Sequence, residues 1–143
     1  MALEFLMLFP FVVAMLYASA IYGIVFFSQY QLQNVVDRAV ATALYVDRSA
    51  DHEDKGGLKN VVEGRGNSVV ADLLSRLPDP VSGAQGTEDG FCGTAEVGGV
   101  EMLRCSVTYN YAENPIVPVM SFGMLGNFPP LPDTLRAEAH AAF

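Results

Sequence analysis

The feature that most constrains this chain is an uncharged, apolar run over residues 5–27. At the rise of an α-helix this run is roughly 34 Å long, which is enough for the hydrocarbon core of a bilayer at about 30 Å. Lipid offers no hydrogen-bond partners to the backbone, so a helix is the form in which such a segment enters a membrane. The run therefore predicts a transmembrane helix close to the N-terminus.

Apolar residues continue beyond this run at the spacing of one helix face. They are Leu32, Val35, Val36, Ala39, Val40 and Ala43. No glycine or proline lies between Ile24 and Lys55, and Gly56-Gly57 supplies a stop. We therefore expect one helix over 1–50, which is transmembrane over 1–28 and amphipathic over 29–50. The amphipathic half needs a cover for its apolar stripe, and the domain that follows is the candidate.

Residues 56–143 are expected to form a globular head. The apolar spacing predicts a short helix near 67–77, with Asn67 or Ser68 as its N-cap. Alternation predicts a hairpin over 91–111 and a C-terminal strand over 134–143, whose alanines would let a helix lie close. The fold class is α+β: a long N-terminal helix packed under a small antiparallel sheet of three or four strands.

The two cysteines lie on the predicted hairpin. Gly98-Gly99 favours a two-residue turn, and the register it sets places Cys92 opposite Cys105. They fall in a non-hydrogen-bonded pair, with Cα atoms about 4.5 Å apart, which is within disulfide reach. A disulfide is expected, and it would require an oxidising compartment. Two free buried thiols are the alternative. The same register sets Glu96 against Glu101, so a bulge or slip remains open.

An apolar connection runs from Asn114 to Asp133, and its five prolines make a long regular element improbable. An apolar stretch of this length is hard to bury in so small a domain. Either it forms a subunit-contact surface or dips to the membrane face, or it wraps the back of the sheet and completes the core.

Several residues within the apolar run, and Glu4 just before it, carry expectations of their own. Pro10 should kink or loosen the helix. Ala14 with Ala18, and Ser19 with Gly23, recur at a spacing that lets helices approach closely, although ordinary anchor composition gives the same pattern. Glu4 is either a solvated end residue or a carboxylate that pairs with an α-amino group, its own or a neighbour's, and so sets the stagger between subunits.

The charge distribution bears on partners and targeting. The net charge is −8 and the first cation is Arg38. An acidic head argues against nucleic acid as a partner. Orientation in a membrane is normally set by cytoplasmic Lys and Arg. Their absence before the run indicates that a basic leader has been removed, so that Met1 begins the mature chain. The alternative is that Met1 is the initiator of a plain anchor.

No pattern in the chain predicts an enzyme, a cofactor site or a metal site. His52 and His140 have no partners at zinc spacing, and phosphate-binding and hydrolase motifs are missing from the sequence. Asp79, Glu88 and Asp89 could hold Ca²⁺ in a loop, but solvated loop acids are the favoured interpretation.

The order of several short motifs resembles the TadE-like pseudopilins, minor pilins of tight-adherence (type IVc) pili. The resemblance is close over residues 2–45, where Ala2-Leu3-Glu4-Phe5 is followed by Pro10, Tyr22-Gly23-Ile24, Leu32-Gln33-Asn34 and Val35-Val36-Asp37-Arg38-Ala39. It is loose over 102–143, and residues 46–91 match nothing in that family.

The resemblance implies a type IV pilin-like fold and a structural role. A prepilin peptidase would remove a basic leader at the bacterial inner membrane, and an assembly machinery would extract the helix into an extracellular filament of like subunits or other pilins. Glu4 would then pair with the N-terminal amine of a neighbouring subunit. In that family the glutamate is usually fifth after the cut, whereas here it is fourth if Met1 is the mature start. The alternative function is a membrane-anchored periplasmic assembly or binding module that does not polymerise.

Overall fold

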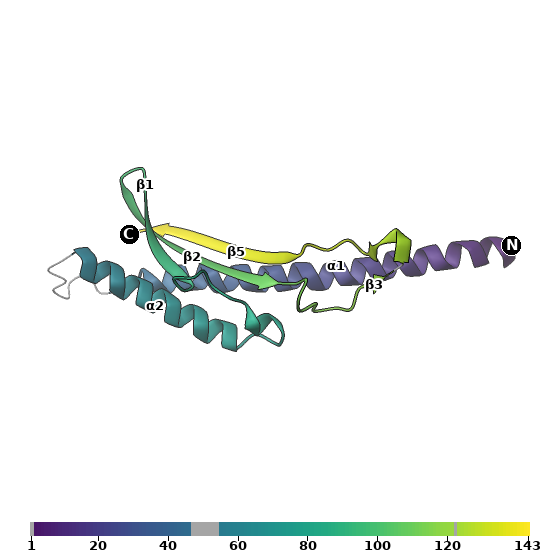
Figure 1. Ribbon diagram of the computed structural model, residues 1–143, viewed down its shortest axis with the longest axis horizontal. Helices are drawn as coiled ribbons and strands as arrows, with labels where there is room; N and C mark the ends of the chain where they lie inside the picture. The colour runs from purple at the N-terminus through teal and green to yellow at the C-terminus, as the bar shows by residue number, and fades with distance from the viewer. Residues whose placement is uncertain (1, 47–54, 122) are drawn as a thin grey trace.

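The computed structural model describes residues 2–46, 55–121 and 123–143. Its elements are α1 (Ala2–Ala43), α2 (Lys55–Ser75), η1 (Val81–Gly83), β1 (Cys92–Val97), β2 (Val100–Asn110), β3 (Met120–Ser121), η2 (Gly123–Leu125), β4 (Asn127–Phe128) and β5 (Thr134–Ala142). Helix α1 is a rod of about 63 Å. The rest of the chain packs along it, and its N-terminal end projects beyond every other element (Figure 1).

The apolar stripe predicted on α1 is confirmed as the centre of the core. All six of its residues are buried: Leu32, Val35, Val36, Ala39, Val40 and Ala43. Helix α1 passes through Pro10 without an interruption. The prediction that it continues to about residue 50 was wrong. The helix ends at Ala43, where the Tyr45 amide bonds back to the Thr42 carbonyl at 3.2 Å and so tightens the last turn.

The boundaries of α2 also correct the sequence analysis. The helix begins at Lys55 rather than near residue 67, so Gly56 and Gly57 lie in its first turn and do not act as a stop. Asn67 lies inside the helix, not at its N-cap. Low intrinsic propensity is overridden here because α2 packs against α1 and β1, and packing supplies most of the stability of helices in proteins.

One glycine of α2 permits a close approach to the sheet. A Cβ atom added to Gly66 would lie 2.9 Å from the Cys92 sulfur and 3.2 Å from the Cys92 Cβ. The separation from the sulfur is shorter than real contacts and that from the Cβ atom is tight. Cys92 is buried and held by its disulfide, so it cannot swing aside. Gly66 therefore sets the distance between α2 and β1.

Substitution of two neighbouring glycines should separate packing from helix propensity. Gly64→Ala has open space around the new methyl group and should stabilise the head by about 0.5–1 kcal/mol. Gly66→Ala gains the same propensity but forces α2 off β1, and overpacking of this kind costs about 1–3 kcal/mol. Urea unfolding followed by circular dichroism should therefore shift the two midpoints in opposite directions. A stabilised Gly66→Ala variant would contradict the close approach.

The main sheet has three antiparallel strands in the order β1-β2-β5, and β3 and β4 form a separate two-stranded hairpin. The predicted register is confirmed, with Cys92 opposite Cys105 and Val97 opposite Val100. The cysteines form the expected disulfide, with Cα atoms 4.0 Å apart. Glu96 and Glu101 do lie opposite one another without a bulge. Lys59 offsets the repulsion, because its Nζ lies 2.7 Å from the Glu101 carboxylate, and this hydrogen bond raises the pKa of Lys59.

The two faces of the sheet differ as the alternation predicted. Leu103, Cys105, Val107 and Tyr109 on β2 are buried beneath the sheet, with Leu135 and Ala137 on β5. The outer face carries a charged cluster centred on Glu138, which lies 2.7 Å from Arg104 and 2.8 Å from Arg136. The hydrogen bond from Arg104, followed by that from His140, lowers the pKa of the Glu138 carboxyl. The departure is Ser106, which is buried although it belongs to the outer face.

Candidate functional site

The candidate functional site is the N-terminal third of α1, over residues 3–16, which we call the apolar rod. Large apolar side chains are exposed all round it: Leu3, Phe5, Leu6, Met7, Leu8, Phe9, Phe11, Val12, Val13, Met15 and Leu16. Phe5 is 68% exposed and Met7 81%. A surface helix of a water-soluble protein has one apolar stripe that faces its core. A rod that is apolar on every side requires an apolar surrounding.

Helix α1 meets the length and composition of a membrane span. Within residues 2–46, 55–121 and 123–143, it is the one helix that does so. Its apolar part coincides with the rod and with the residues that follow it towards the head. The coarse expectation of an apolar helix able to anchor the chain in a membrane is thus met.

Glu4 is the one charged side chain of the rod. It lies on the first turn of α1 and is exposed, in a shallow apolar depression lined by Leu3, Met7, Leu8 and Phe11. It forms no ion pair with any residue that the structure describes. The expected pairing with the amino group of Met1 lies outside the described residues. An intermolecular partner for Glu4 stays a prediction.

The four small residues on α1 have different surroundings. Ser19 and Gly23 are exposed, and a Cβ atom added at Gly23 would meet nothing within 4 Å. Ala18 is half-buried, while Ala14 lines a groove against the β3–β4 hairpin. Of the two pairs, Ser19 and Gly23 thus present a smooth open surface on which a second helix could lie closely.

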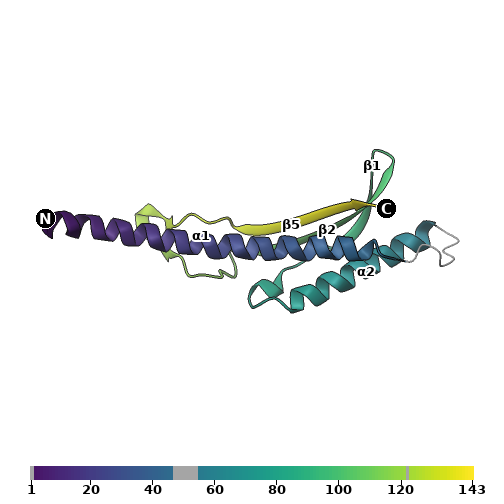
Figure 2. The same cartoon turned by 180° about the vertical axis from the view of Figure 1, so that it is seen from behind.

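The connection over residues 114–133, which we call the strap, lies along α1. One interpretation of the sequence had it wrap the back of the sheet and complete the core. It lies along α1 instead of the back of the sheet, but Ile116, Val117 and Leu131 are partly buried against the core, so the second half of that interpretation is met in part. Its first part bonds to α1 where the Tyr17 hydroxyl donates to the Pro118 carbonyl at 2.9 Å, and its last part where the Tyr22 hydroxyl donates to the Pro130 carbonyl at 2.9 Å. Figures 1 and 2 show its two limbs on opposite sides of the α1 ribbon.

Subunits can associate by adding a strand to an open sheet edge, and the edges of the main sheet are β1 and β5. At the β5 edge, two side chains of α1 bond to outward-facing carbonyl groups. Gln29 Nε2 donates to the Arg136 carbonyl at 2.5 Å, and Gln33 Nε2 donates to the Glu138 carbonyl at 3.1 Å.

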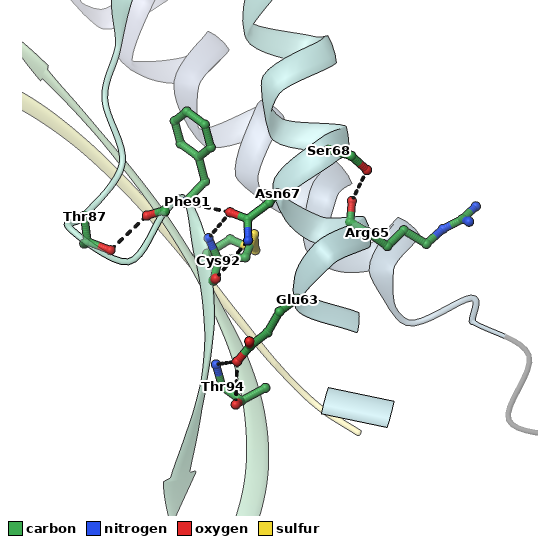
Figure 3. Close-up of a disulfide and its surroundings, with 10 residues drawn as sticks. Glu63, Arg65, Asn67, Ser68, Thr87, Phe91, Cys92 and Thr94 are labelled. Atoms are coloured by element: carbon green, nitrogen blue, oxygen red, sulfur yellow. Dashed lines mark hydrogen bonds between the residues drawn. A yellow bond between two sulfur atoms is a disulfide. The ribbon is translucent and has the colours of Figure 1, made fainter. Parts of the chain in front are cut away.

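At the β1 edge, two side chains of α2 bond to backbone groups of β1 and of the residue before it (Figure 3). Glu63 accepts hydrogen bonds at 2.6 Å from both the amide and the hydroxyl group of Thr94. The Asn67 side-chain oxygen accepts from the amides of Phe91, at 2.7 Å, and Cys92, at 2.9 Å, and its nitrogen donates to the Cys92 carbonyl.

We call these side-chain hydrogen bonds to the strand edges edge caps, and the two sets have the same geometric origin. Residues four apart on a helix are separated by about 6 Å along its axis, and outward-facing groups two apart on a strand by about 6.7 Å. Helix positions 29 and 33 therefore match strand positions 136 and 138, and helix positions 63 and 67 match strand positions 94 and 92. At these positions the edges are already bonded within the chain, whereas the apolar side chains of the rod have no such cover.

Sequence reasoning missed these caps and the two tyrosines that hold the strap. Gln33 was named only among the residues that carry the family resemblance, and Asn67 was assigned to an N-cap. A signal for the tyrosines was present, because Tyr17 and Tyr22 place two phenolic hydroxyl groups in a mostly apolar run and each needs an acceptor.

No group of three or more His, Cys, Asp or Glu side chains that could hold a metal ion occurs within the described parts of the chain. Comparisons with protein-family models, with curated proteins and with solved structures found no match for this chain.

Proposed function

We propose that this chain is a structural subunit of the type IV pilin kind, related to the TadE-like pseudopilins, which lodges in a membrane by α1 and polymerises through it. The observation that carries the proposal is the exposure of large apolar side chains on every side of the apolar rod. A bilayer and a bundle of like helices are the two surroundings that satisfy such a surface. A pilin uses both in turn, first the bacterial inner membrane and then an extracellular filament.

Two further features support polymerisation over a permanent anchor. Ser19 and Gly23 leave an open, smooth surface on α1 that the head does not use. Glu4 places a carboxylate on the rod without a partner among the described residues, and in a bundle an amino group of a neighbour would neutralise it. The partners proposed are other copies of this chain or other pilins, the pilus assembly machinery and a prepilin peptidase.

Electron microscopy of the purified chain after removal of detergent tests the proposal. Filaments are expected, with the α1 helices packed in their core. Gly23→Leu should reduce filament yield, because a leucine would hold neighbouring helices apart, yet leave the unfolding temperature of the head unchanged. Gly64→Leu on α2 is the matched control, since Gly64 has equally open surroundings and lies on the head. A chain that yields only single copies under these conditions would instead be a fixed anchor.

A further inference from the structure

We propose that the β3–β4 hairpin of the strap enters the bilayer together with α1, so that the membrane-embedded part of this protein is a helix with a hairpin bound to it. The described residues of the hairpin are 120–121 and 123–128, and lipid acyl chains are the partners of its exposed side chains. This inference rests on the membrane stage of the proposed function and is independent of polymerisation.

The position of the hairpin along α1 is the first argument. Met120 and Phe128 lie against Phe9, Pro10 and Val13, with which they line an apolar groove of about 380 Å³. These α1 residues lie about 9–15 Å along the helix axis from Leu3. A helix that crosses a hydrocarbon core of about 30 Å from Leu3 onward therefore carries the hairpin into that core.

The composition of the strap fits an apolar surrounding. No charged residue occurs between Glu113 and Asp133. The exposed side chains of the hairpin include Met120 at 52%, Phe128 at 38% and Met124 at 105%, so Met124 projects freely from the turn. A methionine that is held fully in water contributes nothing to a folded domain, whereas in lipid it is at its preferred location.

Backbone outside a helix is costly to bury in lipid because its N–H and C=O groups need partners. Two features of the strap reduce the number of groups left without one. Unbonded backbone groups cost several kcal/mol each in lipid, as an order of magnitude. Five strap positions are proline and have no N–H to satisfy: Pro115, Pro118, Pro129, Pro130 and Pro132. The hairpin closes on itself through the β3–β4 pairing and the bond from the Gly126 amide to the Gly123 carbonyl.

The bonds between strap and helix satisfy both elements at once. In lipid the hydroxyl groups of Tyr17 and Tyr22 would be left unpaired on an isolated helix. The Pro118 and Pro130 carbonyls accept these two hydrogens, so each bond removes one unpaired donor from α1 and one unpaired acceptor from the strap. This mutual satisfaction is the arrangement expected of two segments that share an apolar surrounding.

The chain contains no tryptophan, so a single introduced tryptophan reports its own surroundings. We would place Met124→Trp in the full chain, reconstituted in phosphatidylcholine vesicles, and measure quenching by brominated lipid and by aqueous acrylamide. Met120→Trp gives a second site on the hairpin. Leu6→Trp, on the rod, is the membrane reference, and Val97→Trp, at the exposed β1–β2 turn far from the N-terminus, is the aqueous reference (Figure 1).

The expected result is that the two hairpin tryptophans are quenched by brominated lipid about as strongly as Leu6→Trp, and several-fold more than Val97→Trp. Hairpin tryptophans that behave like Val97→Trp while Leu6→Trp is quenched would overturn the inference alone. Shielding from acrylamide without quenching by lipid would also overturn it, since another protein copy would then cover the hairpin. If Leu6→Trp also escapes lipid quenching, the membrane stage of the proposed function fails as well.

Discussion

Replacement of Cys92 and Cys105 together by alanine is expected to lower the free energy of unfolding of the head by about 3 kcal/mol. The bridge joins residues 13 apart in sequence, and in the chain-entropy account it stabilises the fold by restricting the unfolded chain. Both residues are buried between the sheet and α2, so loss of the sulfurs also removes packing. Denaturant unfolding followed by circular dichroism, in detergent that covers the apolar rod, measures the change.

A double-mutant cycle makes this prediction specific to the α2–β1 contact. In the wild-type background Gly66→Ala should destabilise, because the new methyl group meets the Cys92 sulfur. In the alanine pair that sulfur is absent, so the same substitution should lose most of its cost and approach the gain of Gly64→Ala. The coupling energy should exceed about 1 kcal/mol, as expected for residues in direct contact.

Chemical reduction of the wild-type chain supplies an independent control, because it breaks the disulfide without any substitution. The reduced protein should unfold at a lower denaturant concentration than the oxidised chain, and the alanine pair, which also loses packing, should unfold at the same concentration as the reduced protein or a lower one. An unchanged midpoint in both would mean that the disulfide does not hold the head together, and that α2 and the edge caps alone do so.

The parts of the fold that were predictable are those set by local pattern. The apolar residues from Leu32 to Ala43 have the spacing of one helix face, and that face is buried in the core. The turn at Gly98-Gly99 fixes the hairpin register, and with it the partners of Cys92 and Cys105. These features depend on neighbours close in sequence, so they follow from the residues themselves.

The parts that were missed depend on contacts between distant segments. The start of α2 at Lys55 was not predicted because its glycines weaken a helix by propensity, and only packing against α1 and β1 stabilises it. Gln29 and Asn67 cap strands that lie far away in the sequence, so no local pattern marks them as caps. The place of the strap on α1 was missed for the same reason, although its apolar character had already raised a membrane or subunit contact.

These contacts also indicate how the fold leaves one surface for its function. The caps bond the sheet edges at four positions, and the outer face of the sheet is charged around Glu138. The strap covers α1 as far as Phe9. The apolar surface left for a partner includes the part of the rod that the strap does not cover, with Glu4 near its tip, and Phe26 and Phe27 further along α1.

Replacement of Glu4 by glutamine is expected to reduce filament formation by at least tenfold while leaving membrane insertion unchanged. The proposed partner of the carboxylate is an amino group of a neighbouring subunit, brought next to it when rods pack side by side. Removal of one member of an ion pair buried in a low-dielectric bundle costs about 3–5 kcal/mol, and 1.4 kcal/mol already corresponds to a factor of ten. Glutamine retains the shape of the side chain, so the loss reports on charge.

The control for geometry is Glu4→Asp, which keeps the carboxylate but shortens its reach. A reduced filament yield from this variant would indicate that the ion pair fixes the stagger between subunits. If only the charge mattered, removal of one methylene group would leave the yield unchanged. Insertion is followed by flotation of the chain with vesicles, and assembly by sedimentation and electron microscopy. For an end residue that is merely solvated, Glu4→Gln should insert as well or better, because the apolar rod loses a charge, and should assemble normally. Insertion and assembly must therefore separate in this variant, and normal filaments from Glu4→Gln would remove the role in assembly proposed for this carboxylate.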